Sequence, residues 1–488
     1  MDILDEQLES VDLSTYGAGP NSIAIYGDVV AVAVEADPKQ NPGKVVFFDL
    51  DGVYQNQVTA GALPDMVSFS KDGRHIAWAN DGEPNADYSI DPEGSVTLVD
   101  LTNGPLQAKV TQIDFKAFNQ GQPRYAELTD KVRISAPNAT VAQDLEPEYL
   151  TFADNGKLYV ALQENNALAA IDVASAEVDA ILGLGGKPWD TAQLDASNKD
   201  KNIGNLQSYA MLEGLYMPDS ITSYSVDGNT YIVTANEGDG REYGIKTTQQ
   251  LCDDKGFEWD GDDTTTTENY TTEKDFCIAY VDEVRGKKLD VDANHPLAGA
   301  LKDNKRLARL KVIKPQGTLA ADQKVQVFGS RSFSIWDESG ELVFDSGDDF
   351  ARIVLEQDPA NFNSTNDNNQ SGDDRSDDKG AEPEAIEVAE INGKHYAFIG
   401  LERQGGIMVY DVTQPKNASF ISYLNNRDFT QPVCTKVDED GDCDNETYNS
   451  KAGDLGPESI KYFTRSGNHF IAVGNEVSGS TSVYRVEF

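Results

Sequence analysis

A short sequence motif repeats along this chain and constrains its fold more than any other feature. A proline and a polar or acidic residue open an alternating strand, a turn follows, and a second strand ends near a carboxylate. Clear copies begin at Pro20, Pro64, Pro147, Pro218, Pro383 and Pro457. A deviant copy begins at Arg331, where arginine takes the place of proline. Together the seven starts predict a fold built from repeated sheets.

The spacing of the repeats predicts a β-propeller. A four-stranded blade needs roughly 40–50 residues, and longer intervals between the starts would then hold insertions near residues 109–141, 189–211, 250–324, 358–379 and 431–452. Turn sequences such as Asp72-Gly73 separate β-branched strands, and helical periodicity is nearly absent. We therefore predict an all-β, seven-bladed propeller forming one domain over residues 1–488, with residues 8–13 closing the last blade. An open solenoid is the alternative.

The charge of the chain limits its partners and its location. The 83 acidic and 40 basic side chains give a formal net charge of −43. Such a surface repels nucleic acid and anionic membranes and attracts cations. No apolar stretch reaches the length of a transmembrane helix, so we predict no transmembrane segment. The first residues do not read as a signal peptide, and we expect that a natural leader has been removed.

The four cysteines support an exported protein. Each pair brackets an acidic, turn-rich segment, which favours the disulfides Cys252–Cys277 and Cys434–Cys443, although four cysteines allow two other pairings. Disulfides imply an oxidising compartment. The four histidines lie far apart and there is no CxxC motif, which makes a zinc site unlikely.

Several sequence motifs of the chain resemble those of one known family. They include Asn80-Asp81-Gly82-Glu83-Pro84-Asn85, Thr234-Ala235-Asn236-Glu237-Gly238-Asp239, Arg331-Ser332-Phe333-Ser334-Ile335-Trp336 and Gly474-Asn475-Glu476-Val477-Ser478-Gly479. These motifs are similar to those of the bacterial choice-of-anchor I family, and the resemblance extends across nearly the whole chain. The resemblance implies an exported propeller, secreted or at the cell surface, extracellular or periplasmic. Some members are labelled alkaline-phosphatase-like or mesenchyme-specific cell-surface-glycoprotein-like.

Carboxylates recur at two places in each repeat, which suggests a metal site. The first two strands of a blade are antiparallel, so the start of one and the end of the other lie at the same rim. The predicted rim ligands are Glu83, Glu148, Glu164, Asp219, Glu237, Glu384, Glu402, Glu458 and Glu476. Crowded carboxylates need cations to stay ionised, and oxygen ligands favour Ca²⁺, with another divalent metal possible. The alternative is that each acid caps backbone amides at a turn.

A second acidic group lies between two cysteines. Its carboxylates fall at every second position, at Asp438, Asp440, Asp442 and Asp444. This pattern is close to a calcium loop but departs from the EF-hand spacing. The alternative is a solvated acidic tip held by the disulfide.

Three arginines punctuate the predicted rim, at Arg241, Arg331 and Arg403. Paired with the carboxylates, they would only balance charge. Free of them, they would clamp a phosphate or carboxylate, as metal-dependent phosphoester hydrolysis requires. The first functional prediction is therefore an extracellular calcium-binding surface or ligand-binding protein, whose partners would be divalent cations, a small phosphorylated or anionic ligand, or another surface protein. The alternative is a metal-dependent phosphoesterase with these arginines as catalytic residues.

Overall fold

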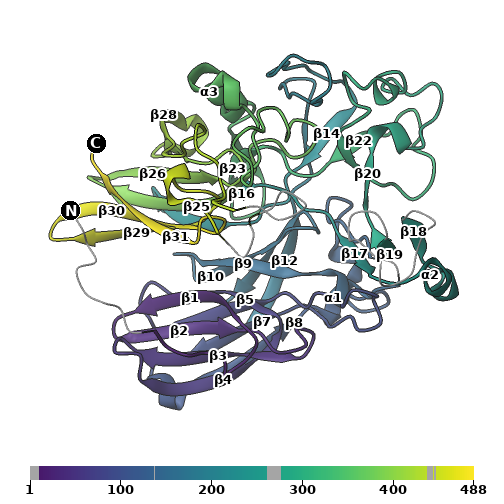
Figure 1. Ribbon diagram of the computed structural model, residues 1–488. Helices are drawn as coiled ribbons and strands as arrows, with labels where there is room; N and C mark the ends of the chain where they lie inside the picture. The colour runs from purple at the N-terminus through teal and green to yellow at the C-terminus, as the bar shows by residue number, and fades with distance from the viewer. Residues whose placement is uncertain (1–9, 137, 261–275, 437–442, 444–446) are drawn as a thin grey trace. The chain divides into compact units, whose positions relative to one another are not determined.

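The computed structural model describes residues 10–136, 138–260, 276–436, 443 and 447–488 (Figure 1). The protein is all-β, as predicted, with short antiparallel strands throughout. The α-helices of the described residues are α1 (Val141–Asp144), α2 (Gln249–Lys255) and α3 (Asp349–Gln357). None of the helices in these ranges is long and apolar enough to cross a membrane. The chain divides into two compact units, and each is described by itself below.

Unit 1 comprises Met1–Ile181 and Glu242–Val281. Three four-stranded sheets follow one another in simple up-and-down order. Their strands are β1 (Pro20–Tyr26), β2 (Val29–Val34), β3 (Pro42–Asp49) and β4 (Tyr54–Ala62); β5 (Pro64–Phe69), β6 (His75–Asn80), β7 (Ser95–Asp100) and β8 (Lys109–Asp114); and β9 (Pro147–Phe152), β10 (Lys157–Leu162), β11 (Ala167–Asp172) and β12 (Glu177–Gly183). The first strands are neighbours, with β5 beside β1 and β9, as in consecutive propeller blades.

The sheets of unit 1 stack through alternating apolar side chains. Trp78 on β6 is fully buried with Phe47 of β3 between the first two sheets. Leu158 and Val160 of β10 pack with Val96 of β7 between the second and third. A smaller sheet adds β17 (Glu242–Ile245), β18 (Glu258–Asp260) and β19 (Phe276–Val281). Short 3-10 turns lie at Pro105–Gln107, Lys116–Phe118 and Tyr125–Glu127.

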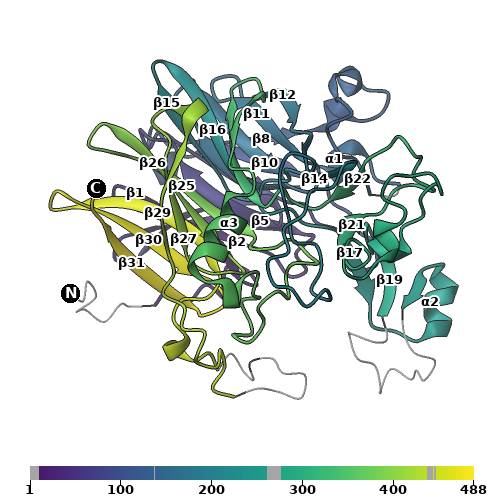
Figure 2. The ribbon, with the colours of Figure 1, turned by 90° about the horizontal axis from the view of Figure 1, so that it is seen from above.

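Unit 2 comprises Leu182–Arg241 and Asp282–Phe488. Its larger sheets contain β15 (Ile221–Val226), β16 (Asn229–Asn236), β23 (Ser332–Asp337) and β24 (Leu342–Asp345); β25 (Pro383–Ile391), β26 (Lys394–Leu401), β27 (Ile407–Asp411) and β28 (Ser419–Leu424); and β29 (Pro457–Arg465), β30 (Asn468–Asn475) and β31 (Ser480–Val486). Figure 2 shows the last of these sheets in yellow. The first strand β25 lies beside β15 and β29, again in the manner of consecutive blades.

Smaller elements of unit 2 come from the long interruptions of the repeat. One sheet joins β13 (Gly186–Pro188), β14 (Leu212–Leu215) and β22 (Val325–Val327), and a two-stranded sheet joins β20 (Glu283–Arg285) and β21 (Lys311–Ile313). Short 3-10 turns lie at Gly286–Lys288, Ala300–Lys302, Pro359–Asn361, Pro415–Asn417 and Ser450–Ala452. A separate apolar cluster around Trp189 and Leu212 stabilises this region.

The path of the chain between β16 and β23 is unusual. After β16 in unit 2, the segment Glu242–Val281 belongs to unit 1, and the chain then returns to unit 2 with β20. The predicted insertion 250–324 is divided by this path, with residues 250–281 in unit 1 and residues 282–324 in unit 2. The third strand of the interrupted sheet therefore follows its second strand only after about a hundred residues.

This excursion explains an error in the sequence analysis. The copy at Arg331 is not the first strand of a blade, because β23 pairs with β16 and is the third strand of the sheet that begins with β15. Arg331 itself has a positive φ of 54°, in the turn that leads into β23. The described residues form five four-stranded and one three-stranded sheet of the repeated up-and-down kind, so the predicted seven blades are not confirmed.

Two predictions about the whole chain remain open. Residues 1–9 lie outside the described residues, so the pairing of residues 8–13 with the last blade stays a prediction. The closure of all sheets into a single domain over residues 1–488 stays a prediction as well.

Candidate functional site

Strand pairing brings the two carboxylate positions of each repeat together. Because the first and second strands are antiparallel, the opening proline faces the end of the second strand. The observed pairs are Pro64 with Asn80, Pro147 with Leu162, Pro383 with Leu401 and Pro457 with Asn475. The acid after the proline therefore lies near the acid that follows the second strand.

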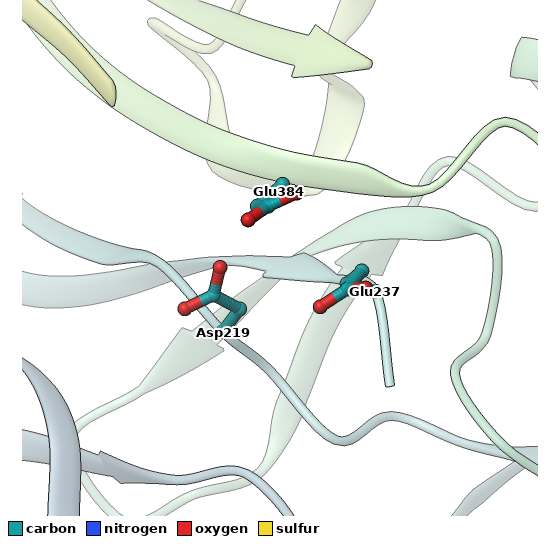
Figure 3. A group of neighbouring side chains, drawn as sticks. All are labelled: Asp219, Glu237 and Glu384. Carbon is teal, nitrogen blue, oxygen red and sulfur yellow. The ribbon is translucent and has the colours of Figure 1, made fainter. Parts of the chain in front are cut away.

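In unit 2 this geometry produces a group of three carboxylates, which we call the rim triad. Asp219 precedes β15, Glu237 follows β16 and Glu384 is the second residue of β25. One carboxylate oxygen from each lies within 4.8 Å of the others. Figure 3 shows the three side chains gathered from separate strands. Glu237 and Glu384 are buried and Asp219 is half-buried, so the group can be reached from only part of its surroundings.

Glu384 is the member of the rim triad with an unpartnered carboxylate oxygen. Only 8% of the residue is exposed, and its Oε2 has no hydrogen-bond partner among the described residues. Burial raises the pKa of Glu384 well above its usual value, and the nearby charges of Glu237 and Glu402 raise it further. A buried carboxylate that lacks a donor is costly unless a proton or a cation is supplied.

The neighbouring acids show the same crowding. Burial raises the pKa of Glu237 to about 8, although the ammonium of Lys379 acts in the opposite direction. Burial and the charge of Glu382 raise the pKa of Glu402 to about 7. Protons are therefore bound near neutral pH in a region where the sequence placed several negative charges. A cation that replaced those protons would remove the repulsion between the carboxylates.

A second carboxylate group, formed by Glu237, Glu382 and Glu402, is equally compact but already neutralised. Glu382 is fully buried and pairs with Arg375 at 2.5 Å, Lys379 at 3.2 Å and Arg403 at 3.4 Å. Although burial opposes ionisation, Lys379, Arg375 and Arg403 together lower the pKa of Glu382 to about 2. Glu382 is therefore an ion-paired structural residue. Lys379 also pairs with Glu237 of the rim triad at 2.5 Å, whereas Glu384 keeps an oxygen without a hydrogen-bond partner among the described residues.

The three predicted catalytic arginines have different surroundings. Arg331 donates to the backbone carbonyl oxygens of Asp195 at 2.8 Å and Ser376 at 3.1 Å, and also to that of Asp378. Arg403 pairs with Glu402 at 3.0 Å. These contacts favour the charge-balancing and structural interpretation of both residues over an anion clamp.

Arg241 is 2% exposed, and its backbone N–H donates to Asp282 Oδ1 at 2.9 Å.

Unit 1 contains its own group of acids, around Asp81. This residue follows β6, is 8% exposed, and has an Oδ1 without a hydrogen-bond partner among the described residues. Burial raises the pKa of Asp81 well above its usual value, and Glu83, Glu146 and Glu164 add to the effect. Glu83 also pairs with Lys39.

The remaining predicted ligands fall into two sets. Glu148 is half-buried at the start of β9, while Glu458 and Glu476 are exposed at the ends of β29 and β30. Asp438, Asp440, Asp442 and Asp444 lie outside the described residues. The structure contains both predicted disulfides, Cys252–Cys277 and Cys434–Cys443.

Sequence reasoning missed the residue that precedes the opening proline. Glu146 and Glu382 hold this position in their repeats, and both are buried within the acidic groups. Comparing the repeats one residue earlier would have shown an acid before proline in two of the six copies. Asp81, two residues before Glu83, was also missed, because its neighbour Glu83 was the more obvious strand-end acid.

The rim triad has the chemistry of a hard-cation site. Its candidate ligands are carboxylate oxygens, which Ca²⁺ prefers, and the three come from three separate strands whose backbones are fixed by sheet pairing. Asp219, Glu237 and Glu384 would supply the protein ligands, and solvent can complete the coordination on the side of half-buried Asp219.

Comparison with a curated protein finds a mesenchyme-specific cell surface glycoprotein of Strongylocentrotus purpuratus, 25% identical over 338 residues. The match covers 64% of this chain and 41% of that protein, so the chain spans less than half the length of this relative.

Solved structures with some likeness include Kuenenia stuttgartiensis hydrazine synthase, with a TM-score of 0.35 and 12% identity over 99% of both chains. Another is virginiamycin B lyase from Staphylococcus aureus, with a TM-score of 0.30 and 11% identity over 96% of this chain and 94% of that one. At these scores the likeness carries no argument about function. The model of the choice-of-anchor I domain, in contrast, matches residues 4–415, and the chain belongs to this family.

Proposed function

We propose that this chain is an extracellular, cell-surface β-propeller that binds calcium at the rim triad and acts through binding rather than catalysis. The observation that carries the proposal is the buried Glu384 carboxylate, whose unpartnered Oε2 lies beside Asp219 and Glu237. The name of the sea urchin relative, the two disulfides and the net charge of −43 support the extracellular part. The repeated sheets with adjacent first strands support the propeller.

Calcium would act on stability through the charge of the triad. Burial and neighbouring carboxylates raise the pKa of Glu384 and Glu237 in the triad, and a divalent ion would replace the protons that these two groups bind. A ligand that binds only the folded state adds about 2.7 kcal/mol of stability at 100 times its dissociation constant. Mg²⁺ is expected to be less effective, because it demands a smaller octahedral site and retains its water.

The test combines metal analysis with a matched pair of variants. The full chain is purified, equilibrated with calcium and assayed for bound metal by mass spectrometry, beside Glu384→Gln and Glu390→Gln. Glu390 lies on the same strand β25 but is exposed, so its variant controls for the loss of one negative charge. We expect Glu384→Gln to bind one calcium ion fewer than the wild type and Glu390→Gln to bind the same number. Equal calcium content in all three proteins would rule out the rim triad as the site.

A further inference from the structure

A cavity of about 460 Å³ lies in unit 1. Its wall includes Glu35, Asp37 and Lys39 from the segment between β2 and β3, Pro84 and Asn85 from the segment after β6, and Tyr243 of β17. This size suits a small organic molecule or the end of a long side chain. The carboxylates in the wall give the cavity an anionic character.

Further acids of unit 1 act electrostatically on the tyrosine of this wall. Tyr243 lies within electrostatic range of Glu146, Glu83, Glu164 and Asp81. Burial, followed by the charges of these carboxylates, raises the pKa of the Tyr243 hydroxyl, which therefore stays protonated. Asp81 contributes an unpartnered Oδ1 on a side chain that is more than nine-tenths buried.

An ammonium group of the protein already lies in this environment. The Nζ atom of Lys39 pairs with Glu83. Burial opposes the charge of Lys39, yet Glu83, Asp81 and Glu35 more than offset it and raise the pKa of Lys39 above its usual value. The surroundings of the cavity thus stabilise an ammonium ion that is partly removed from water.

The spacing of the carboxylates favours an organic cation over a bare metal ion. Calcium binds oxygen ligands at about 2.3–2.6 Å, so two ligand oxygens lie at most about 5 Å apart. Among the described residues, the compact carboxylate triads are both in unit 2. The acids around Asp81 are spread more widely, as a larger cation requires.

An aromatic group completes the cavity. Tyr243 packs edge to face against Tyr88, with ring centroids 5.0 Å apart, and Tyr88 packs in the same manner against Tyr280 at 5.7 Å. These contacts hold the Tyr243 ring in place. A fixed aromatic ring beside carboxylates is the arrangement that recognises ammonium groups through cation–π attraction.

We infer that unit 1 carries a binding site for an organic ammonium group, formed by the cavity walls at Glu35, Asp37 and Tyr243 and reinforced by the buried carboxylate of Asp81. The group belongs either to a free amine or to a lysine side chain of another protein, and the chemistry of recognition is the same for both. The site is separate from the proposed calcium site, so either can be lost without the other.

The experiment is calorimetric titration of the full chain with saturating calcium present. The probes are 1,4-diaminobutane, tetramethylammonium and a short peptide with one lysine, compared with the same peptide carrying norleucine. We expect the two small cations to bind, because both carry the ammonium charge. Stronger binding of the lysine peptide than of diaminobutane would identify a protein partner as the source, and the reverse order would identify a free amine.

Three variants make the result specific. Asp81→Asn removes a buried carboxyl group that would ionise when an ammonium group binds, and is expected to weaken diaminobutane binding about tenfold or more. Tyr243→Leu removes the ring and is expected to weaken tetramethylammonium binding by about fivefold. Asp28→Asn removes an exposed charge in the turn between β1 and β2 and is expected to change neither affinity.

Glu35→Gln provides a second test of the charge at the wall if Asp81→Asn does not fold. The inference is overturned if no amine binds to the wild type at millimolar concentration, if only calcium binds to unit 1, or if Asp28→Asn weakens binding as much as Asp81→Asn. Loss of calcium from the Glu384→Gln variant with amine binding intact would leave this inference standing independently of the proposed function.

Discussion

Replacement of Glu384 by glutamine is expected to stabilise the protein without calcium and to abolish its response to calcium. One carboxylate oxygen of each triad residue lies within 4.8 Å of the others, and two unit charges at about this distance repel by about 3 kcal/mol at an effective dielectric constant of ~20. The carboxyl escapes this repulsion by keeping its proton. Burial and the charges of Glu237 and Glu402 raise the pKa of Glu384, so ionisation of this carboxyl destabilises the folded state.

Glutamine avoids this cost but leaves amide groups to satisfy, so we expect a net gain of about 2 kcal/mol. Unit 2 has roughly 270 residues, for which 1 kcal/mol corresponds to about 2 °C in melting temperature. The expected rise for Glu384→Gln in the presence of a chelator is therefore about 4 °C. The wild type should gain about 5 °C from calcium at 100 times its dissociation constant, and the variant should gain almost nothing at this site.

The assay is differential scanning calorimetry of wild type, Glu384→Gln and Glu390→Gln, with EGTA or calcium. Ionic strength is held constant, because monovalent salt also screens a net charge of −43. The sign of the pH dependence gives a further check. A raised carboxyl pKa means that stability without calcium falls as pH rises above about 4.5, and this fall should be smaller in Glu384→Gln.

Two results would refute the reasoning. One is a calcium response in Glu384→Gln that equals the response of the wild type. The other is a loss of stability in EGTA that is greater than that of Glu390→Gln, since it would show that the carboxylate is stabilised by the protein itself.

Three further predictions concern structural residues. Arg331→Ala should lose about 3 kcal/mol or more, measured by denaturant unfolding, because three buried carbonyl oxygens lose a charged donor; unchanged stability, together with loss of any phosphoester turnover, would instead favour an anion clamp. Glu382→Gln should lose about 3 kcal/mol at pH 7, and in the wild type this contribution should disappear as pH falls from about 4.5 to about 2; a variant with the same acid unfolding curve as the wild type would contradict the assignment. Removing the disulfide with Cys252→Ser and Cys277→Ser should cost about 3 kcal/mol, and thiol titration of the denatured wild type should find no free cysteine.

The all-β fold and the starts of most repeated sheets could be predicted, because each repeat carries the same local pattern of proline, strand, turn and strand. The prolines at 64, 147, 383 and 457 each open the first strand of a sheet, as the sequence indicated. Glycine turns such as Asp72-Gly73, where Gly73 has a φ of 67°, separate first and second strands because glycine adopts the left-handed region without strain. These signals are local, so the strands and turns that they mark can be predicted without knowledge of the tertiary structure.

The error at Arg331 arose because the order of strands in this sheet depends on segments that are distant in the sequence. A third strand that follows its second strand after about a hundred residues cannot be told from a new first strand by alternation alone. Only the pairing of β16 with β23 distinguishes the two. The positive φ of Arg331 is likewise set by its contacts with the loop at Ser376 and Asp378 rather than by its own side chain.

The positions of the acidic residues in the candidate site could be predicted, but the pairing of these residues with basic side chains could not. Sequence placed Glu237, Glu384 and Glu402 at the strand ends, where the structure brings them close together. It could not show that Arg375 and Lys379, from a long loop, pair with Glu382 and Glu237, while Glu384 keeps an oxygen without a hydrogen-bond partner among the described residues. That division depends on how the loop folds back, which no spacing in the sequence encodes.

The excursion of the chain between β16 and β23 has a consequence for synthesis. A nascent chain emerges from its N-terminus, and domains generally fold as they become complete. Unit 1 contains residues up to Val281, although its three main sheets end near residue 181. The three sheets can therefore form early, but the tyrosines at 243 and 280 arrive only after the first two strands of a sheet in unit 2 have been made. A truncated chain that stops at residue 181 would hold a hydrophobic core without its Tyr243 and Tyr280, and one that stops at residue 281 would carry two strands waiting for a third.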